Sequence, residues 1–272
     1  KRAETLGIPT PKTYEITNLK EAKPLAKQLE YPLVVKPRVG SGSGGVHYVN
    51  EPSRLTPALE WVFRSGQLPL LQERLPSDGA GIGASFLLDQ EGQVRASFIH
   101  RRIREYPVKG GPSTLRESTL HNQVKDDGAR LLQNLHLTGV AMVEFKIDSR
   151  DGKAKLLEIN PRFWGSLPLA INAGVNFPYL LTLMALDLDF PPVLDYKLGQ
   201  LCRWLLPGDI LHFLKNPQRW QLQPSFFEFR QPNLTYDIID INDPLPILGS
   251  VLALLPFYGS HDFDHVRTRR RS

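Results

Sequence analysis

Two glutamates and an asparagine lie at matching positions on either side of a predicted turn. Asp151-Gly152 is a strong turn signal, and the segments on both sides of it read as strands, so together they predict an antiparallel hairpin. If the strands pair symmetrically about residue 151, Glu144 faces Glu158 directly. Asn160 lies two residues beyond Glu158, so its side chain lies on the same face of that strand.

This pair of carboxylates predicts a divalent metal site. Side chains directly opposed in a sheet have Cβ atoms about 4.5–5.5 Å apart, where two negative charges repel unless a cation or a shared proton lies between them. Glu144, Glu158 and the amide oxygen of Asn160 suit Mg²⁺ or Mn²⁺, which keep other positions for water and substrate phosphates. Arg162 follows the strand and could grip a phosphate or a carboxylate.

The same hairpin has a simpler interpretation. The two glutamates could be exposed strand residues, with their charge balanced by nearby lysines. A one-residue bulge would also change the register that brings the glutamates together. The lysines in question are Lys146, Lys153 and Lys155.

A glycine-rich loop lies between two predicted strands nearer the N-terminus. Residues 40–45 read Gly-Ser-Gly-Ser-Gly-Gly, and Lys36 precedes them, whereas a Walker loop has its lysine after the glycines and a dinucleotide-binding loop opens a helix. A glycine loop between strands can fold over a triphosphate, because residues without a Cβ let backbone N–H groups approach the phosphates. A floppy surface hairpin is the alternative. Protein kinases also use such a loop, but their later signatures do not occur in this sequence.

Composition and charge exclude several classes of protein. The 272 residues carry a formal charge of +5, but the C-terminal run Arg267, Arg269, Arg270 and Arg271 supplies four of those charges. We therefore expect no nucleic-acid surface on the body of the protein, and a flexible basic tail. The single cysteine, Cys202, excludes a disulfide framework within the chain. With no apolar run of about 18 residues and no signal-peptide pattern, the sequence predicts a cytoplasmic protein without stable membrane insertion.

The elements that must position these residues are mostly strands. From residue 70 to residue 147 strand patterns dominate, and apolar residues at helical spacing over residues 122–137 predict a helix packed on the sheet. Residues 179–188 predict another helix. Beyond it, residues 189–272 are rich in proline and aromatic residues and are expected to extend the fold.

Taken together, the motifs resemble the ATP-grasp superfamily. The order is a lysine before a glycine loop, then Gln72-Glu73-Arg-Leu75, then Glu144, then Glu158-Ile-Asn-Pro-Arg. The resemblance is to the synthetase domains of the carbamoyl-phosphate synthase large chain and to related carboxylate-amine ligases, and it covers about residues 1–188. It implies an α+β fold in which two α+β lobes with antiparallel sheets clamp ATP.

The resemblance also implies a division of the chain. Residues 1–70 would form the small lobe with the glycine-rich lid, residues 71–188 the large lobe with the metal site, and residues 189–272 a C-terminal extension with its basic tail. The N-terminal domain of Rossmann-like shape that usually precedes this region in the family is expected to be absent from this chain.

Each motif residue takes a role from the resemblance. Lys36 would contact the α- and β-phosphates, and Arg162 would stabilise the transferred phosphoryl group and the acyl-phosphate intermediate. Glu144, Glu158 and Asn160 would hold two magnesium ions. The remaining assignments are Ser41, Gly42, Ser43, Gly44 and Gly45 as the lid, and Gln72, Glu73 and Leu75 as the adenine-reading connector, which acts largely through backbone groups of Glu73 and Leu75.

The implied reaction is a two-step ligation of small molecules. A substrate carboxylate attacks the γ-phosphorus of ATP to give an acyl phosphate and ADP, and an amine or similar nucleophile then displaces phosphate. The main alternative is a non-catalytic ATP sensor or scaffold, and another is a kinase-like phosphotransferase. The protein could act as a homodimer.

Several polar segments have no role by this reasoning. His100-Arg101-Arg102 and residues 109–113 lie where relatives contact phosphate or a second substrate. Asp78 is a candidate ribose ligand or a turn residue. The acidic stretch 237–243 is expected to be a solvated edge, and the alternative is that its carboxylates shape a pocket for a cationic amine.

Overall fold

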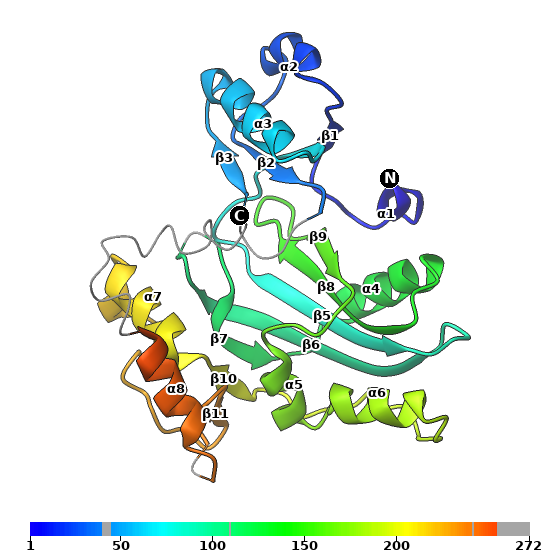
Figure 1. Ribbon diagram of the computed structural model, residues 1–272, viewed down its shortest axis with the longest axis vertical. Helices are drawn as coiled ribbons and strands as arrows, with labels where there is room; N and C mark the ends of the chain where they lie inside the picture. The colour runs from blue at the N-terminus through cyan, green and yellow to red at the C-terminus, as the bar shows by residue number, and fades with distance from the viewer. Residues whose placement is uncertain (40–44, 109, 241, 255–272) are drawn as a thin grey trace.

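The computed structural model describes residues 1–39, 45–108, 110–240 and 242–254. Within these ranges a small lobe stands over a larger sheet, and the C-terminal helices lie at one end of that sheet (Figure 1). The predicted lid residues Ser41, Gly42, Ser43 and Gly44 and the arginine-rich tail lie outside the described residues.

The small lobe is a four-stranded antiparallel sheet with strand order β1-β4-β2-β3. Leu33, Val35 and Leu71 of this sheet are buried against apolar residues of its helices. Between them Val34 and Lys36 point the other way and line the space between the lobes. Its elements, after α1 (Arg2–Thr5), are β1 (Thr13–Glu15), α2 (Leu19–Ala26), β2 (Leu33–Pro37), β3 (His47–Val49), a 3-10 turn (Pro52–Arg54), α3 (Leu55–Arg64) and β4 (Pro69–Glu73).

The large lobe is built on a seven-stranded sheet with strand order β11-β10-β7-β6-β5-β8-β9. All its strand pairs are antiparallel except β10 with β11. Its first elements are β5 (Gly81–Leu88), β6 (Val94–Glu105), β7 (Ser113–Ser118), α4 (Asn122–Asn134), β8 (Gly139–Ile147), β9 (Ala154–Asn160), α5 (Leu167–Ala173) and α6 (Phe177–Ala185). The later ones are β10 (Leu201–Arg203), a π-type turn (Leu205–Asp209), α7 (Ile210–Lys215), a 3-10 turn (Arg219–Gln221), β11 (Leu234–Tyr236) and α8 (Leu245–Leu254).

The two faces of the large sheet differ in polarity. One face packs against α4, with Phe86, Val143 and Leu132 in a single buried cluster. On the other face, α5 and α6 cover one half, where Phe98 and Met142 are buried. The second half of that face lies beneath the small lobe (Figure 1), and polar side chains such as Glu144 and Asn160 on it line the space between the lobes.

The structure refines two expectations about the division of the chain. A boundary after residue 70 would cut β4, which pairs with both β1 and β2, so the small sheet ends at Glu73 instead. The segment beyond residue 188 is also more than an extension, because β10 and β11 add two strands to the large sheet. The predicted helix over residues 122–137 is confirmed as α4, whereas α5 was not anticipated.

The β8–β9 hairpin pairs Glu144 with Glu158, as predicted, but for a different reason. The turn itself pairs Ile147 with Ala154, which on its own would place Glu144 opposite Leu157. A register shift between Glu144 and Phe145 leaves Leu157 without a partner in the ladder and moves Glu158 into place. The strand pair thus contains a one-residue bulge, which restores the predicted pairing of the glutamates rather than spoiling it.

No single helix within the described ranges is long and apolar enough to cross a membrane. The helices α5 and α6 satisfy the length and composition criteria only together, and an 87° bend separates them.

Candidate active site

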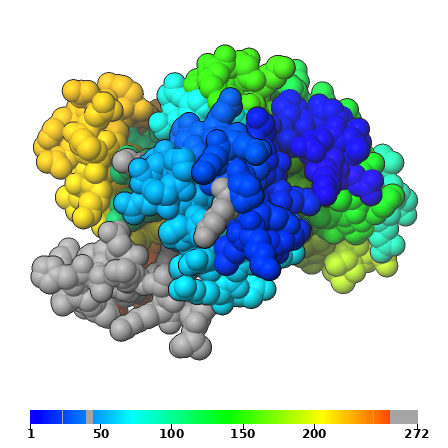
Figure 2. Space-filling model, turned by 90° about the horizontal axis from the view of Figure 1, so that it is seen from above, coloured from blue at the N-terminus to red at the C-terminus, as the bar shows by residue number. Residues whose placement is uncertain are grey.

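A cleft of about 1160 Å³ lies between the small lobe and the polar half of the large sheet. The small lobe contributes Lys36 and Gln72 to its lining, the large sheet contributes Glu144 and Glu158, and the C-terminal region contributes Trp204 and further residues. Seen from above, the blue and cyan small lobe lies over the middle of the molecule, flanked by yellow residues near positions 200–220 (Figure 2). Elements far apart in the sequence therefore enclose one cavity.

The three predicted metal ligands meet on the β8–β9 hairpin. The amide nitrogen Nδ2 of Asn160 donates to Glu144 Oε1 at 3.2 Å and to Glu158 Oε1 at 3.0 Å. Arg162 Nη2 donates to Asn160 Oδ1 at 3.1 Å. The structure thus brings both carboxylates, the amide and the following arginine into one connected group, as the spacing of these residues predicts.

Lys36 joins this group from the small lobe. Its Nζ donates to the backbone oxygen of Leu157 at 3.3 Å. Because Leu157 has no partner in the β8–β9 ladder, its carbonyl is available to a group from the facing lobe. The same irregularity therefore aligns the two glutamates and provides the acceptor for Lys36.

Arg102 is the most important residue whose role the sequence did not define. Its Nη2 forms an ion pair with Glu144 Oε2, although one whole strand, β5, lies between β6 and β8. On that strand Gly83 is paired with both His100 and Glu144, and Gly81 is paired with Lys146. A Cβ at Gly81 would lie 3.1 Å from Arg102 Cδ, and one at Gly83 would lie 2.2 Å from His100 Cε1.

These glycines are therefore a structural requirement of the site. A side chain at Gly83 would occupy the space of the His100 imidazole, and one at Gly81 would press on the Arg102 side chain that reaches Glu144. The usable signal in the sequence was Gly81-Ile-Gly83 inside an otherwise apolar strand pattern, because an isolated glycine in a strand marks close approach of another group.

Burial and neighbouring charge set the protonation of the site. Burial raises the pKa of Glu144, as does the charge of Glu158, while Arg102 opposes the shift. Burial lowers the pKa of Lys36, and both glutamates counteract this. Burial, together with Arg102 and Arg116, lowers the pKa of His100 to about 3, so this imidazole is neutral at pH 7.

The donor set fits a hard divalent cation. Glu144 and Glu158 present carboxylate oxygens from directly paired positions, and the Asn160 carboxamide lies between them. In the part of the chain described, no cluster of three or more His, Cys, Asp or Glu side chains is suited to a metal. Magnesium needs only one or two carboxylates when substrate phosphates and water complete its shell, so two glutamates and an amide suffice.

The predicted adenine connector also lines the cleft. Gln72 is buried, and its Nε2 donates to Thr13 Oγ1 at 2.8 Å. Leu75 is also buried, and its backbone N–H makes no hydrogen bond with any described residue, so it is available to a ligand. Gly45, the last residue of the predicted lid and the only one described, has φ of +80°, a conformation that favours glycine.

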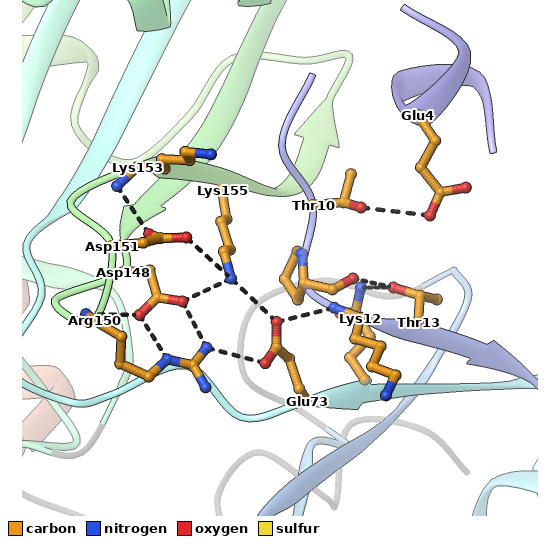
Figure 3. Close-up of polar contacts among 12 residues, drawn as sticks. Glu4, Thr10, Lys12, Thr13, Glu73, Asp148, Arg150, Asp151, Lys153 and Lys155 are labelled. Carbon is orange, nitrogen blue, oxygen red and sulfur yellow. Dashed lines mark hydrogen bonds and ion pairs between the residues drawn. The ribbon is translucent and has the colours of Figure 1, made fainter. Parts of the chain in front are cut away.

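Glu73 has a role that its position in the motif did not reveal. Its Oε1 accepts hydrogen bonds from the backbone N–H of Lys12 at 3.0 Å and from Lys155 Nζ at 3.2 Å, and Arg150 Nη2 donates to Oε2 at 3.0 Å (Figure 3). Asp148 completes the group, because Arg150 and Lys155 both contact it. The side chain of Glu73 thus ties β4 of the small lobe to the β8–β9 turn of the large lobe.

The other residues singled out in the sequence have structural partners. Asp78 lines the cleft and accepts a hydrogen bond from Ser149 Oγ at 2.7 Å, so its assignment to ribose stays a prediction. Trp164 packs edge-on against Phe177 of α6, with ring centroids 5.1 Å apart.

Comparison with known proteins matches the chain to one family. Residues 71–205 match the family described as ATP-grasp in the biosynthetic pathway with Ter operon. The chain is 28% identical to the carbamoyl phosphate synthase large chain of Xylella fastidiosa over 183 residues, which is 64% of this chain and 17% of that protein. It is 25% identical to the C-terminal section of the large chain from Methanopyrus kandleri, covering 72% of this chain and 38% of that protein. The chain thus spans well under half of these relatives.

Solved structures share the fold at low sequence identity. The biotin carboxylase domain of Hydrogenobacter thermophilus 2-oxoglutarate carboxylase, in complex with MgADP, ADP and bicarbonate, superposes with a TM-score of 0.63 at 17% identity, covering 74% of this chain and 47% of that one. N5-carboxyaminoimidazole synthetase from Staphylococcus aureus, complexed with ADP, gives 0.60 at 17% identity, covering 74% and 52%. The family match and the carbamoyl phosphate synthase relatives, together with the residue order described above, place the chain in the ATP-grasp superfamily, and the solved structures show that it shares the fold.

Proposed function

We propose that this protein is an ATP-dependent ligase that activates a carboxylate as an acyl phosphate for attack by an amine or similar nucleophile. The observation that carries the proposal is the joining of Lys36 from the small lobe to the Glu144, Glu158 and Asn160 group of the large lobe. A cation from one lobe and a metal-ligand set from the other are what a clamped nucleoside triphosphate requires.

The assignment of roles follows the geometry. Lys36 lies beside both glutamates and is suited to the phosphates, while Arg162, held by Asn160, is suited to the phosphoryl group in transfer. We assign the adenine to the end of the cleft near Leu75, whose backbone N–H is available. When bound, Mg²⁺ would neutralise phosphate charge and orient the triphosphate.

Positioning and charge account for the chemistry that the protein has to supply. Phosphoryl transfer needs little covalent participation from side chains, so a nucleophilic triad is not required. The carboxylate substrate would attack the γ-phosphorus, ADP would leave, and the nucleophile would then displace phosphate from the acyl phosphate. Biotin carboxylase and N5-carboxyaminoimidazole synthetase structures with ADP share the fold, which supports a nucleotide in this cleft.

The test is an ADP-release assay with ATP and Mg²⁺ on pools of amino acids, peptides and other carboxylates. Hydroxylamine is added in parallel, because it traps an acyl phosphate as a hydroxamate. The variants are Glu144→Gln and Glu158→Gln, which keep the shape of the side chain and remove its charge, and the control is Glu91→Gln in an exposed turn. We expect carboxylate-dependent ADP release in the wild type and in the control, and at least a 100-fold loss in both site variants.

The possible outcomes separate the candidate functions. Tight MgADP binding without turnover in any pool would favour a nucleotide sensor and contradict the ligase proposal. Phosphorylated product without release of inorganic phosphate would favour a kinase-like transfer. Full activity in Glu158→Gln would remove the basis of the metal assignment.

A further inference from the structure

The end of the cleft beyond the metal ligands is formed by the C-terminal region. Side chains from Trp204, His212, Asn216, Gln223 and Asp237 line it, and none of them lies within the 1–188 segment that carries the family motifs. At about 1160 Å³ the cleft also exceeds the roughly 300–1,000 Å³ typical of a pocket for one small ligand. There is room for a second molecule beside a nucleotide.

Asp237 lies at the end of β11 and is held in place by one of its two carboxylate oxygens. Oδ1 forms an ion pair with Arg116 Nη2 and accepts a hydrogen bond from Cys202 Sγ at 2.9 Å. Oδ2 has no hydrogen-bond partner among the described residues and is not enclosed by them. The carboxylate therefore has a fixed orientation and one free acceptor on the cleft.

Arg116 connects this carboxylate to the loop that follows Arg162. The same Nη2 atom that pairs with Asp237 also donates to the backbone oxygen of Gly165 at 3.4 Å, and Nη1 donates to Ser113 O at 3.2 Å. Arg116 is 1% exposed, so it is a rigid support rather than a surface charge. Arg116 Nη2 thus bridges Asp237 and the loop that follows Arg162, the residue assigned to phosphoryl transfer.

Among the described residues, Arg116 is the one cationic side chain that forms an ion pair with Asp237, and it does so through Oδ1. His212 Nδ1 lies 2.7 Å from the backbone oxygen of Glu105, and Asn216 Nδ2 lies 3.0 Å from His212 Nε2, so both side chains already have hydrogen-bond partners. Trp204 also lines the cleft and adds an aromatic surface to it. Aromatic rings beside a carboxylate are a favourable environment for an amine or ammonium group.

We propose that Asp237 Oδ2 binds the amino group of the second substrate, a primary amine. This inference rests on the proposed function and names the site at which its nucleophile is held. Because Arg116 balances the charge of Asp237, the carboxylate offers a hydrogen-bond acceptor without strongly favouring ammonium over neutral amine, and the neutral form is the one that attacks. Of the acidic stretch 237–243, Asp237 alone takes this role, since Asp240 and Asp243 are exposed.

The test measures binding of small amines directly. Saturation-transfer NMR with MgADP present is applied to the twenty standard amino acids and to linear diamines of three to five carbons, each compared with its analogue lacking the amino group. Dissociation constants of the amines found are then measured for the wild type, Asp237→Asn and Asp240→Asn. We expect at least a tenfold weaker amine affinity in Asp237→Asn and no change in Asp240→Asn.

Two further measurements keep the result interpretable. The double variant R116M/D237N removes both members of the buried pair, so it tests the amine site even if a lone unpaired Arg116 harms folding, and it too should lose the amine. MgADP affinity and hydroxamate formation report on the proposed function separately. If they fail, the ligase assignment fails. If they persist while no amine binds the wild type, or while both variants bind amines normally, the role of Asp237 is refuted.

Discussion

The substitution Gly83→Ala tests whether the open strand β5 is what lets His100 occupy the site. The added Cβ would lie 2.2 Å from His100 Cε1 and 2.9 Å from both ring nitrogens. Carbon atoms prefer separations of about 3.5 Å or more, so the ring has to move by roughly 1.3 Å. His100 is 1% exposed and has little free space in which to move.

The cost of this change can be worked out from the contacts affected. Overpacking of a buried site costs about 1–3 kcal/mol. The displaced ring would also lose its 3.1 Å hydrogen bond with Ser166 Oγ, worth about 1 kcal/mol. We expect Gly83→Ala to lower the free energy of unfolding by about 2–4 kcal/mol, measured by urea denaturation and followed by tryptophan fluorescence.

A double-mutant cycle separates this mechanism from a general sensitivity of the strand. In a His100→Ala background the ring is absent, so Gly83→Ala should lower the free energy of unfolding by less than about 0.5 kcal/mol. Changes at sites that do not interact add to within about this value. As a control, Gly249→Ala in the exposed helix α8 should be stabilising, because no atom lies within 4 Å of its Cβ. An equal cost of Gly83→Ala in both backgrounds would refute the close approach of His100.

Further predictions concern charge at the two ends of the cleft. Because its pKa of about 3 lies far below the usual 6.5, His100 should show constant imidazole ¹⁵N chemical shifts from pH 8 to pH 5. The folded state favours the neutral imidazole, so the contribution of His100 to the free energy of unfolding should decline as the pH falls from about 6.5 towards 3. A titration near pH 6.5 in the folded protein would contradict its burial. Arg102→Met should strengthen Mn²⁺ binding in the absence of nucleotide, read by electron paramagnetic resonance, because a cation competing for Glu144 is removed; weaker binding would contradict this. Lys36→Met should weaken MgADP binding by about 10- to 100-fold, the value of a charge-assisted hydrogen bond, in a fluorescence titration; unchanged affinity would remove Lys36 from the phosphate site. Arg150→Met should lower the free energy of unfolding by about 1 kcal/mol, measured by urea denaturation, because Arg150 is half exposed and Lys155 still contacts Asp148. An unchanged urea midpoint would show that the ion pair between Arg150 and Glu73 is not stabilising.

The sequence by itself determined the local part of the site. Turn chemistry at Asp151-Gly152 and the two-residue period of a strand were enough to place Glu144, Glu158 and Asn160 on one face, because these relations span fewer than twenty residues. The order of motifs identified the fold for the same reason, since each motif is a short segment with its own backbone requirement. The pairing of Glu144 with Glu158 was predicted correctly, although the turn and the bulge were not. The turn shifts the pairing by one residue from the predicted register, and the bulge shifts it back by one residue.

Only the tertiary structure decided which distant residues complete the site. Arg102 reaches Glu144 because β5 lies between their strands and carries glycines there, a fact of sheet order that no local pattern contains. Lys36 meets the bulged carbonyl of Leu157 across 121 positions of sequence, and Asp237 meets Arg116 across another 121. Such contacts depend on how lobes and strands pack against one another, and packing is fixed by the whole core rather than by the spacing of residues within a segment.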